Sequence, residues 1–188
     1  MTMVAWKRFP VPEFKHEEFK DMAYTAPAVA SLEDINRQRD NGSFVALVTA
    51  PSKELLERFQ IRGEFAHAVA CILPERPAHL LGRSWAWKIQ RALVLDSLDA
   101  ASARVLHDWR TPRPMNTRLG PDDGVTLPGG LCFVITASKY ADHWLGNRYI
   151  VQNDWVPANG GKGFRVLGSS EPDACDFHHT YLAFDWPT

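Results

Sequence analysis

The residues best suited to catalytic chemistry gather in the C-terminal third of the chain. Cys132, Asp142 and His143 supply a thiol, a carboxylate and an imidazole, the groups with which a cysteine hydrolase forms its nucleophile, base and orienting residue. Cys132 stands inside the apolar run 131–137 (LCFVITA), where burial raises the pKa of a thiol and lowers its reactivity. The sequence therefore leaves two readings of Cys132 open, a hydrolase nucleophile and a small core residue.

A second set in the same third could bind a metal ion. Cys175, His178 and His179 stand close together, and thiolate sulfur and imidazole nitrogen are preferred ligands of Zn²⁺. A structural zinc site usually draws on a second pair of ligands, and the chain has no C-x-x-C or H-x-x-H pair to supply it. We therefore predict no cofactor and keep zinc at these three residues as an alternative.

Arginines concentrate in the middle of the chain. Residues 76–118 hold eight basic and three acidic residues, although the whole chain has a formal net charge of −1. Arginine forks bind phosphate and carboxylate groups, and a tryptophan ring can stack on a base. The segment 104–118 is therefore a candidate contact surface, or a set of solvated arginines paired with acids of the same fold. Its candidate binding residues are Arg104, Trp109, Arg110, Arg113 and Arg118.

Binding is favoured over catalysis, because no catalytic set is complete. The sequence predicts a small binding or accessory protein whose segment 104–118 contacts an acidic protein or a nucleic acid. The alternative is an enzyme, either a hydrolase or a metal-dependent one, with its site in the C-terminal third and an unidentified small-molecule substrate. An enzyme needs those side chains to converge in one pocket, whereas a binding protein needs the arginines on one exposed face.

Composition points to a soluble globular protein. The chain has 188 residues, of which 45% are hydrophobic and 23% charged. No segment approaches the roughly 18 consecutive apolar residues of a membrane span, and residues 1–12 lack the apolar stretch of a signal peptide. Three widely spaced cysteines do not form a disulfide framework. We expect a cytoplasmic location and no membrane contact.

The positioning elements follow from apolar periodicity and from helix signals. Helices are predicted at 13–24, 31–41, 53–60, 99–109 and 138–145, with Ser31 as the N-cap of the second. Strands are predicted at 43–50, 65–73, 131–137, 148–156, 164–167 and 177–186. The apolar residues in 84–96 fit both the helical period and the strand period, and their alternation favours a strand.

Helices and strands do not alternate strictly along the chain. The predicted fold is therefore α+β, one domain over residues 1–188 with a mixed or mainly antiparallel sheet and several helices. Residues 1–12 are expected to form an extended arm, and 110–130, with four prolines and four glycines, a long loop. The four clearest strands should lie in one sheet and supply the core: Phe44, Val45, Leu47, Val69, Ile72, Leu131, Phe133, Ile135, Tyr181 and Phe184.

Overall fold

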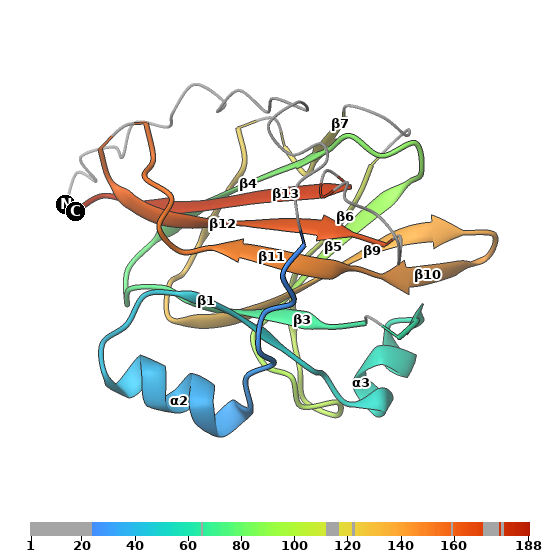
Figure 1. Ribbon diagram of the computed structural model, residues 1–188, viewed down its shortest axis with the longest axis horizontal. Helices are drawn as coiled ribbons and strands as arrows, with labels where there is room; N and C mark the ends of the chain where they lie inside the picture. The colour runs from blue at the N-terminus through green and yellow to red at the C-terminus, as the bar shows by residue number, and fades with distance from the viewer. Residues whose placement is uncertain are drawn as a thin grey trace.

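Two mainly antiparallel β-sheets pack face to face in the computed structural model, and two helices cover the outer face of one of them (Figure 1). The structure describes residues 24–64, 66–111, 117–121, 123–158, 160–170, 177 and 179–188, without the side chains of 117 and 118. Within this part of the chain, no helix is long and apolar enough to cross a membrane.

The first sheet, sheet A, has seven strands arranged around one long strand, β9. The strand β9 pairs with β3, β5 and β10, while β1 extends the sheet from β3, β6 from β5 and β2 from β10. All of these pairs are antiparallel except β2 with β10. The strands are β1 (Ala46–Thr49), β2 (Ile61–Arg62), β3 (Ala68–Ile72), β5 (Gln90–Leu95), β6 (Val105–Arg110), β9 (Leu131–Tyr140) and β10 (His143–Gly146).

The second sheet, sheet B, has six strands and is antiparallel throughout. Its order is β11-β12-β13-β4-β7, and β8 also pairs with β4. The strands are β4 (Ala78–Ser84), β7 (Thr117–Leu119), β8 (Val125–Leu127), β11 (Arg148–Gln152), β12 (Lys162–Ser169) and β13 (Thr180–Trp186).

Alternation along the strands divides the apolar side chains between three clusters. On β9, Val134 faces the core between the sheets, whereas Phe133 and Ile135 face the helices, because successive side chains point to opposite faces. Sheet A is therefore buried on both faces, which explains its nearly continuous apolar runs. A third and smaller cluster covers the outer face of sheet B around Tyr181 and includes Tyr24.

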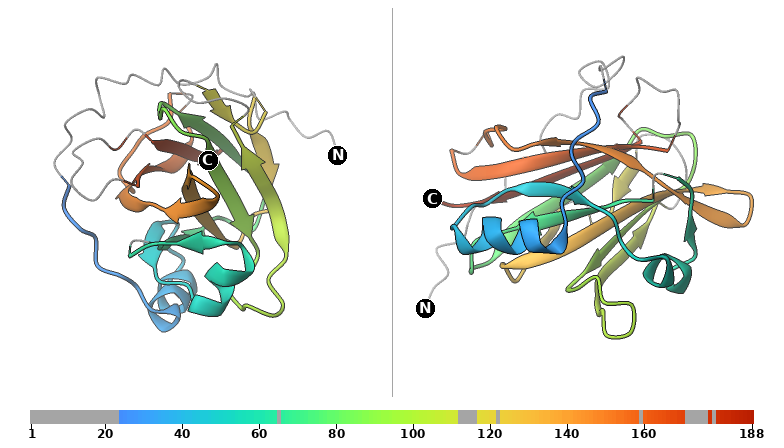
Figure 2. Two further views of the ribbon diagram at one scale, coloured as in Figure 1. Left: turned by 90° about the vertical axis from the view of Figure 1, so that its right-hand side faces the viewer. Right: turned by 60° about the horizontal axis from the view of Figure 1, so that its bottom comes forward.

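Two helices lie on the same side of sheet A (Figure 2). The helix α2 (Leu32–Asp40) begins at Ser31, whose side chain accepts a hydrogen bond from the N–H of Asp34, and α3 (Lys53–Arg58) begins at Ser52 in the same way. Each helix buries one aliphatic residue against the sheet, Ile35 and Leu55 respectively. The predictions of helices at 31–41 and 53–60 are confirmed.

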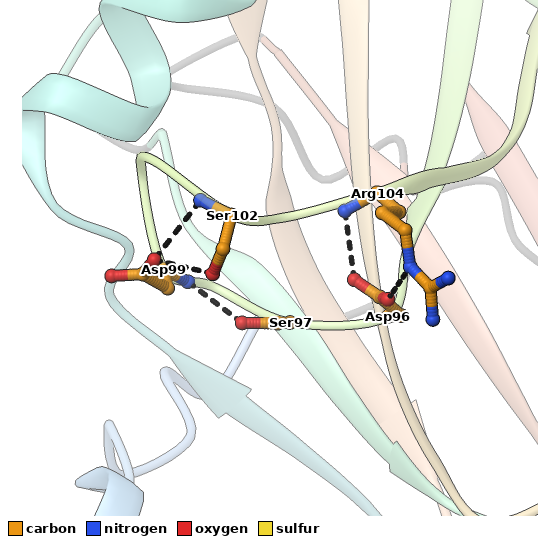
Figure 3. Close-up of polar contacts among 5 residues, drawn as sticks. All are labelled: Asp96, Ser97, Asp99, Ser102 and Arg104. Carbon is orange, nitrogen blue, oxygen red and sulfur yellow. Dashed lines mark hydrogen bonds and ion pairs between the residues drawn. The ribbon is translucent and has the colours of Figure 1, made fainter.

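The prediction of an α+β fold with several helices is wrong. The described residues contain only these two helices, and the rest of the regular structure is strand. The helix predicted at 99–109 is a turn followed by β6, because the Asp99 carboxylate accepts the N–H of Ser102 at 3.0 Å and closes the β5–β6 hairpin (Figure 3). The helix predicted at 138–145 is the β9–β10 hairpin, which turns at Ala141 with φ 52°.

Other element predictions have mixed outcomes. The strand favoured in 84–96 is confirmed as β5, although residues 85–89 are not part of a strand. Two short strands, β7 and β8, lie within 110–130, where a long loop was predicted. The predictions for 1–12 and nearly all of 13–24 lie outside the described residues.

The four clearest predicted strands do not share one sheet. The first three became β1, β3 and β9 of sheet A, but the last became β13 of sheet B, because hydrophobic periodicity contains no information about strand partners. Six of the ten predicted core residues are fully buried: Val69, Ile72, Phe133, Ile135, Tyr181 and Phe184. Phe44 is 44% exposed and lies at the site described next.

Candidate functional site: an aromatic pocket at one end of the sandwich

A pocket with a volume of about 440 Å³ opens at the end of the sandwich where the C-terminus lies (Figure 1). Its walls come from four separate segments: the turn after α2, the residues that follow β11, the start of β12 and the end of β13. The lining residues are Gly42, Phe44, Asn153, Asp154, Trp155, Val156, Gly161, Lys162, Gly163 and Trp186.

Aromatic rings form much of the pocket surface. Trp186 is 2% exposed and makes an edge-to-face contact with Phe44, with 5.9 Å between the two ring centroids. Phe164 packs against Trp186 from the core, with 5.8 Å between centroids, and holds that ring in place. Trp155 is half-buried and Val156 is 74% exposed, so apolar surface continues from the floor to the rim. Exposed aromatic surface in a concave site is typical of ligand-binding pockets.

A glycine on β12 makes room for one of these rings. A Cβ atom at Gly163 would lie 3.1 Å from Cζ3 of Trp155 and 2.1 Å from the carbonyl oxygen of Phe184. The position therefore requires glycine, and the indole rests directly on the strand. The Arg165 guanidinium carbon lies 5.8 Å from the centroid of the same indole, which restricts its movement further.

Three polar side chains line the pocket, and they have different roles. Asn153 is structural, since its Oδ1 accepts from the N–H of Ala46 at 2.7 Å and its Nδ2 donates to the Ala46 carbonyl at 3.0 Å. Those bonds join the end of β11 in sheet B to the start of β1 in sheet A. Asp154 and Lys162 are exposed, and neither side chain has a hydrogen bond or an ion pair within the described part of the chain. Their carboxylate and ammonium groups are therefore available to a ligand.

The predicted hydrolase residues do not converge. Cys132 is 3% exposed and lies opposite Cys71 of β3 in the core, and burial and the Cys132 thiol raise the pKa of Cys71 well above the ordinary thiol value. His143 lies opposite Tyr140 in the β9–β10 hairpin, with Nδ1 3.6 Å from the carboxylate of Asp142. Cys132 and Tyr140 are eight residues apart on one strand, which is about 26 Å of extended chain. The prediction of Cys132, Asp142 and His143 as a catalytic set is wrong.

The predicted zinc ligands fall mostly outside the described residues. Cys175 and His178 lie there, so the zinc alternative stays a prediction. His179 is 7% exposed, and its Nδ1 accepts a hydrogen bond from the N–H of Ser170 at 3.1 Å. Within the described ranges, no three side chains of histidine, cysteine, aspartate or glutamate are grouped so that they could hold a metal ion.

The arginines of segment 104–118 whose side chains the structure describes do not share one contact surface. Arg104 directly precedes β6 and Arg110 ends it, so the two are about 20 Å apart along an extended chain. The Nε of Arg104 donates to Asp96 Oδ2 at 2.8 Å, and its backbone N–H donates to Oδ1 of the same carboxylate (Figure 3). Its charge is thus compensated within the β5–β6 hairpin, where this pairing also lowers the pKa of Asp96.

Trp109 and Arg110, the other two members whose side chains are described, point in different directions. Trp109 packs toward the core between the sheets and stacks on His107, with 4.7 Å between ring centroids, whereas Arg110 extends to the outer face of sheet A. Arg118 belongs to β7 of sheet B, its side chain is not described, and Arg113 lies outside the described residues. The predicted binding surface for an acidic protein or nucleic acid is therefore wrong, because a strand replaces the helix and loop that were expected to gather it.

Comparisons with known proteins give no family for this chain. No protein-family model matches it, and no curated protein sequence is significantly similar. Among solved structures, it is similar to the C-terminal domain of the BC2L-C lectin from Burkholderia cenocepacia, with a TM-score of 0.48, 13% identity, and coverage of 62% of this chain and 92% of the lectin domain.

Two further lectins give similar values. The high-affinity mannose-binding lectin of Ralstonia solanacearum has a TM-score of 0.47 and 15% identity, with coverage of 68% of this chain and 99% of that one. The Chromobacterium violaceum lectin CV2L, solved in complex with alpha-methyl-fucoside, also has a TM-score of 0.47 and 15% identity, with coverage of 63% and 96%. At these values the similarities carry no argument about the fold or ligand of this chain.

Sequence reasoning missed the pocket entirely. None of the predicted site residues that the structure describes is among those lining it. One local signal was present, since Trp155 lies next to the end of the predicted strand 148–156, Trp186 ends the predicted strand 177–186, and Gly160-Gly161 mark a turn beside Trp155. That signal predicts the end of a hairpin, but it does not predict that Phe44, from a distant segment, would complete the pocket there.

Proposed function

We propose that this protein is a non-catalytic carbohydrate-binding protein and that the aromatic pocket is its site. A sugar ring has apolar C–H faces and a rim of hydroxyl groups. The exposed faces of Phe44 and Trp155 suit the former, while Asp154 can accept and Lys162 can donate hydrogen bonds to the latter. The observation that carries the proposal is the presence of these two uncompensated charged groups beside aromatic rings in one open pocket.

The number of carboxylate groups at the site favours binding without hydrolysis. Most glycoside hydrolases need two carboxyl groups on opposite sides of the scissile bond. Asp154 is the only carboxylate among the described residues that line the pocket. These residues can hold and orient a saccharide, but they do not supply an acid and base pair for cleavage.

The first prediction is that Trp155→Ala abolishes saccharide binding. A panel of mono- and disaccharides is screened by saturation-transfer NMR, and the dissociation constant of the best ligand is measured by calorimetry. Trp155→Ala removes a stacking surface, and Asp154→Asn weakens binding about tenfold through the loss of a charge-assisted acceptor. Trp87→Ala is the matched control, since Trp87 is 77% exposed and is not part of the pocket.

Two results would contradict the proposal. One is the absence of binding to every saccharide of the panel by folded wild-type protein. The other is saccharide binding that Trp155→Ala and Asp154→Asn leave unchanged, because the site would then lie elsewhere. Asp154→Asn keeps the second result interpretable, since an exposed carboxylate can be neutralised with little effect on folding.

A further inference from the structure

Three cationic side chains surround one tryptophan on the outer face of sheet A. The ring centroid of Trp144 lies 5.7 Å from Cζ of Arg91, 5.2 Å from Cζ of Arg110 and 5.0 Å from Nζ of Lys139. Lys139 lies opposite Trp144 on the next strand, and Arg91 lies opposite Arg110 and Ala137. Arg91, Arg110, Lys139 and Trp144 are named here the Trp144 cluster.

One of the three cations is already compensated. The Nε and Nη2 atoms of Arg91 each donate to the carboxylate of Asp108 at 2.9 Å, and its Nη1 donates to the carbonyl of Phe59. Arg91 is also 4% exposed. It therefore serves as a fixed part of the sheet and not as a group available to a ligand.

The other two cations have no such partner. Arg110 is exposed and Lys139 half-buried, and neither side chain has a hydrogen bond or ion pair in the part of the chain that the structure describes. Since both lie near one ring centroid, the Arg110 Cζ and the Lys139 Nζ are at most about 10 Å apart. An anion within reach of both would interact favourably with each of them.

We propose that the Trp144 cluster is a binding site for an oxyanion group, a sulfate or a carboxylate. Arg110 would bind it through its guanidinium fork and Lys139 through its ammonium group. Trp144 is 3% exposed, so it positions the two cations and does not stack on the ligand. Strand β10 lies at the end of the molecule opposite the C-terminus, so this site is distinct from the aromatic pocket (Figure 1).

The test uses inorganic sulfate and glucuronate, which separate a free anion from a carboxylate on a sugar. Each is titrated at constant ionic strength against chloride, and binding is followed by the NMR signals of the Trp144 indole N–H and the Arg110 Nε–H. We expect saturable shifts with at least one probe, and affinity at least fivefold lower in Arg110→Gln and in Lys139→Gln. Arg104→Gln is the matched control, because Arg104 is paired with Asp96 at the far end of β6 and should bind like wild type.

Thermal melting gives a second readout. Sulfate stabilises most proteins by exclusion from their surface, so the informative quantity is the difference between variants. A larger sulfate-induced rise in melting temperature for wild type and Arg104→Gln than for the Arg110→Gln/Lys139→Gln double variant supports the site. Shifts that stay linear with both probes, or equal affinities in wild type and Arg110→Gln, would overturn it.

Discussion

At the scale of single residues, Thr136 shows how side chains and a neighbouring backbone group satisfy a buried peptide group that has no strand partner on one side. It lies on β9 between the stretch that pairs with β3 and the stretch that pairs with β10, so no strand faces that side of its backbone. The Tyr149 hydroxyl accepts the Thr136 N–H at 2.8 Å, and the Thr136 carbonyl accepts the N–H of Asn147 at 3.3 Å. A buried peptide group left unpaired would be costly, which explains a tyrosine hydroxyl inside the core.

We predict that Tyr149→Phe lowers the free energy of unfolding by about 1–3 kcal/mol at neutral pH, because it leaves the buried N–H of Thr136 unpaired. Burial raises the pKa of Tyr149 to about 12. A folded-state pKa above the unfolded value of about 10 adds stability that is complete below pH 10 and is lost as the pH rises from about 10 to 12.

Denaturant unfolding at several pH values between 7 and 12 checks both effects. The variant should lose less of its stability over the alkaline range than wild type does. Tyr24→Phe is the control for the effect at neutral pH, since the structure gives the Tyr24 hydroxyl no hydrogen bond within its described residues. Burial also raises the pKa of Tyr24, so the alkaline comparison is made between wild type and Tyr149→Phe. An alkaline loss of equal size in wild type and Tyr149→Phe would show that other groups cause it.

At the scale of elements, local side-chain capping decides where the two helices begin. In α2, Ser31 accepts from the N–H of Asp34, and the Asp34 carboxylate accepts from the N–H of Ser31, which together form a capping box. These bonds, together with Arg37, lower the pKa of Asp34. The same kind of hydrogen bond at Asp99 closes a hairpin turn instead, because the next residues are drawn into a strand that pairs with β5.

Ser31→Ala should lower the free energy of unfolding by about 0.5–2 kcal/mol, the usual effect of removing an N-cap. Because the folded-state pKa of Asp34 is depressed, its contribution is present above the unfolded pKa and is lost as the pH falls through the folded value. The variant should therefore be less sensitive than wild type to acid in this range. Chemical denaturation at pH 7 and in the acid range tests this, with the exposed Thr25→Ala as control.

At the scale of the whole molecule, a buried polar group joins the two sheets. The Nδ2 of Asn147 donates to the hydroxyl of Thr136 in sheet A at 2.8 Å and to the hydroxyl of Thr180 in sheet B at 2.6 Å. Gly168 is required beside them, since a Cβ there would lie 2.7 Å from the Thr180 hydroxyl. The packing of the sheets is thus specified by polar geometry as well as by apolar contact.

We predict that Asn147→Ala lowers the free energy of unfolding by on the order of 3 kcal/mol, because it leaves a cavity and removes the donor to two buried hydroxyls. Thr180→Val should be less destabilising, and the double variant should show less than the sum of the two effects, since the residues share one network. Equilibrium unfolding of the four proteins measures this coupling. The exposed Thr126→Val on β8 is the control, and strict additivity would argue against the network.

The sequence by itself determined the local structure that depends on neighbours along the chain. Local helix signals, with Ser31 as an N-cap, predict both helices, and the long apolar runs predict β1, β3 and β9, because capping and periodicity are short-range effects. The burial of Cys71 and Cys132 follows from the same runs. In 99–109 the local signal was ambiguous. Asp99 predicted the start of a helix, but residues 105–110 form a strand because they pair with β5.

Only the tertiary structure decided which strands are partners and what lies at the ends of the sandwich. Strand pairing joins residues far apart in sequence, and no periodicity in one strand specifies its neighbour. The pocket depends on that pairing, because it brings Phe44, which precedes β1 of sheet A, to Trp155, which follows β11 of sheet B, and to Trp186 of β13. The Trp144 cluster likewise combines β5, β6, β9 and β10. Both sites are properties of the packed sheets, so no contiguous motif could have predicted them.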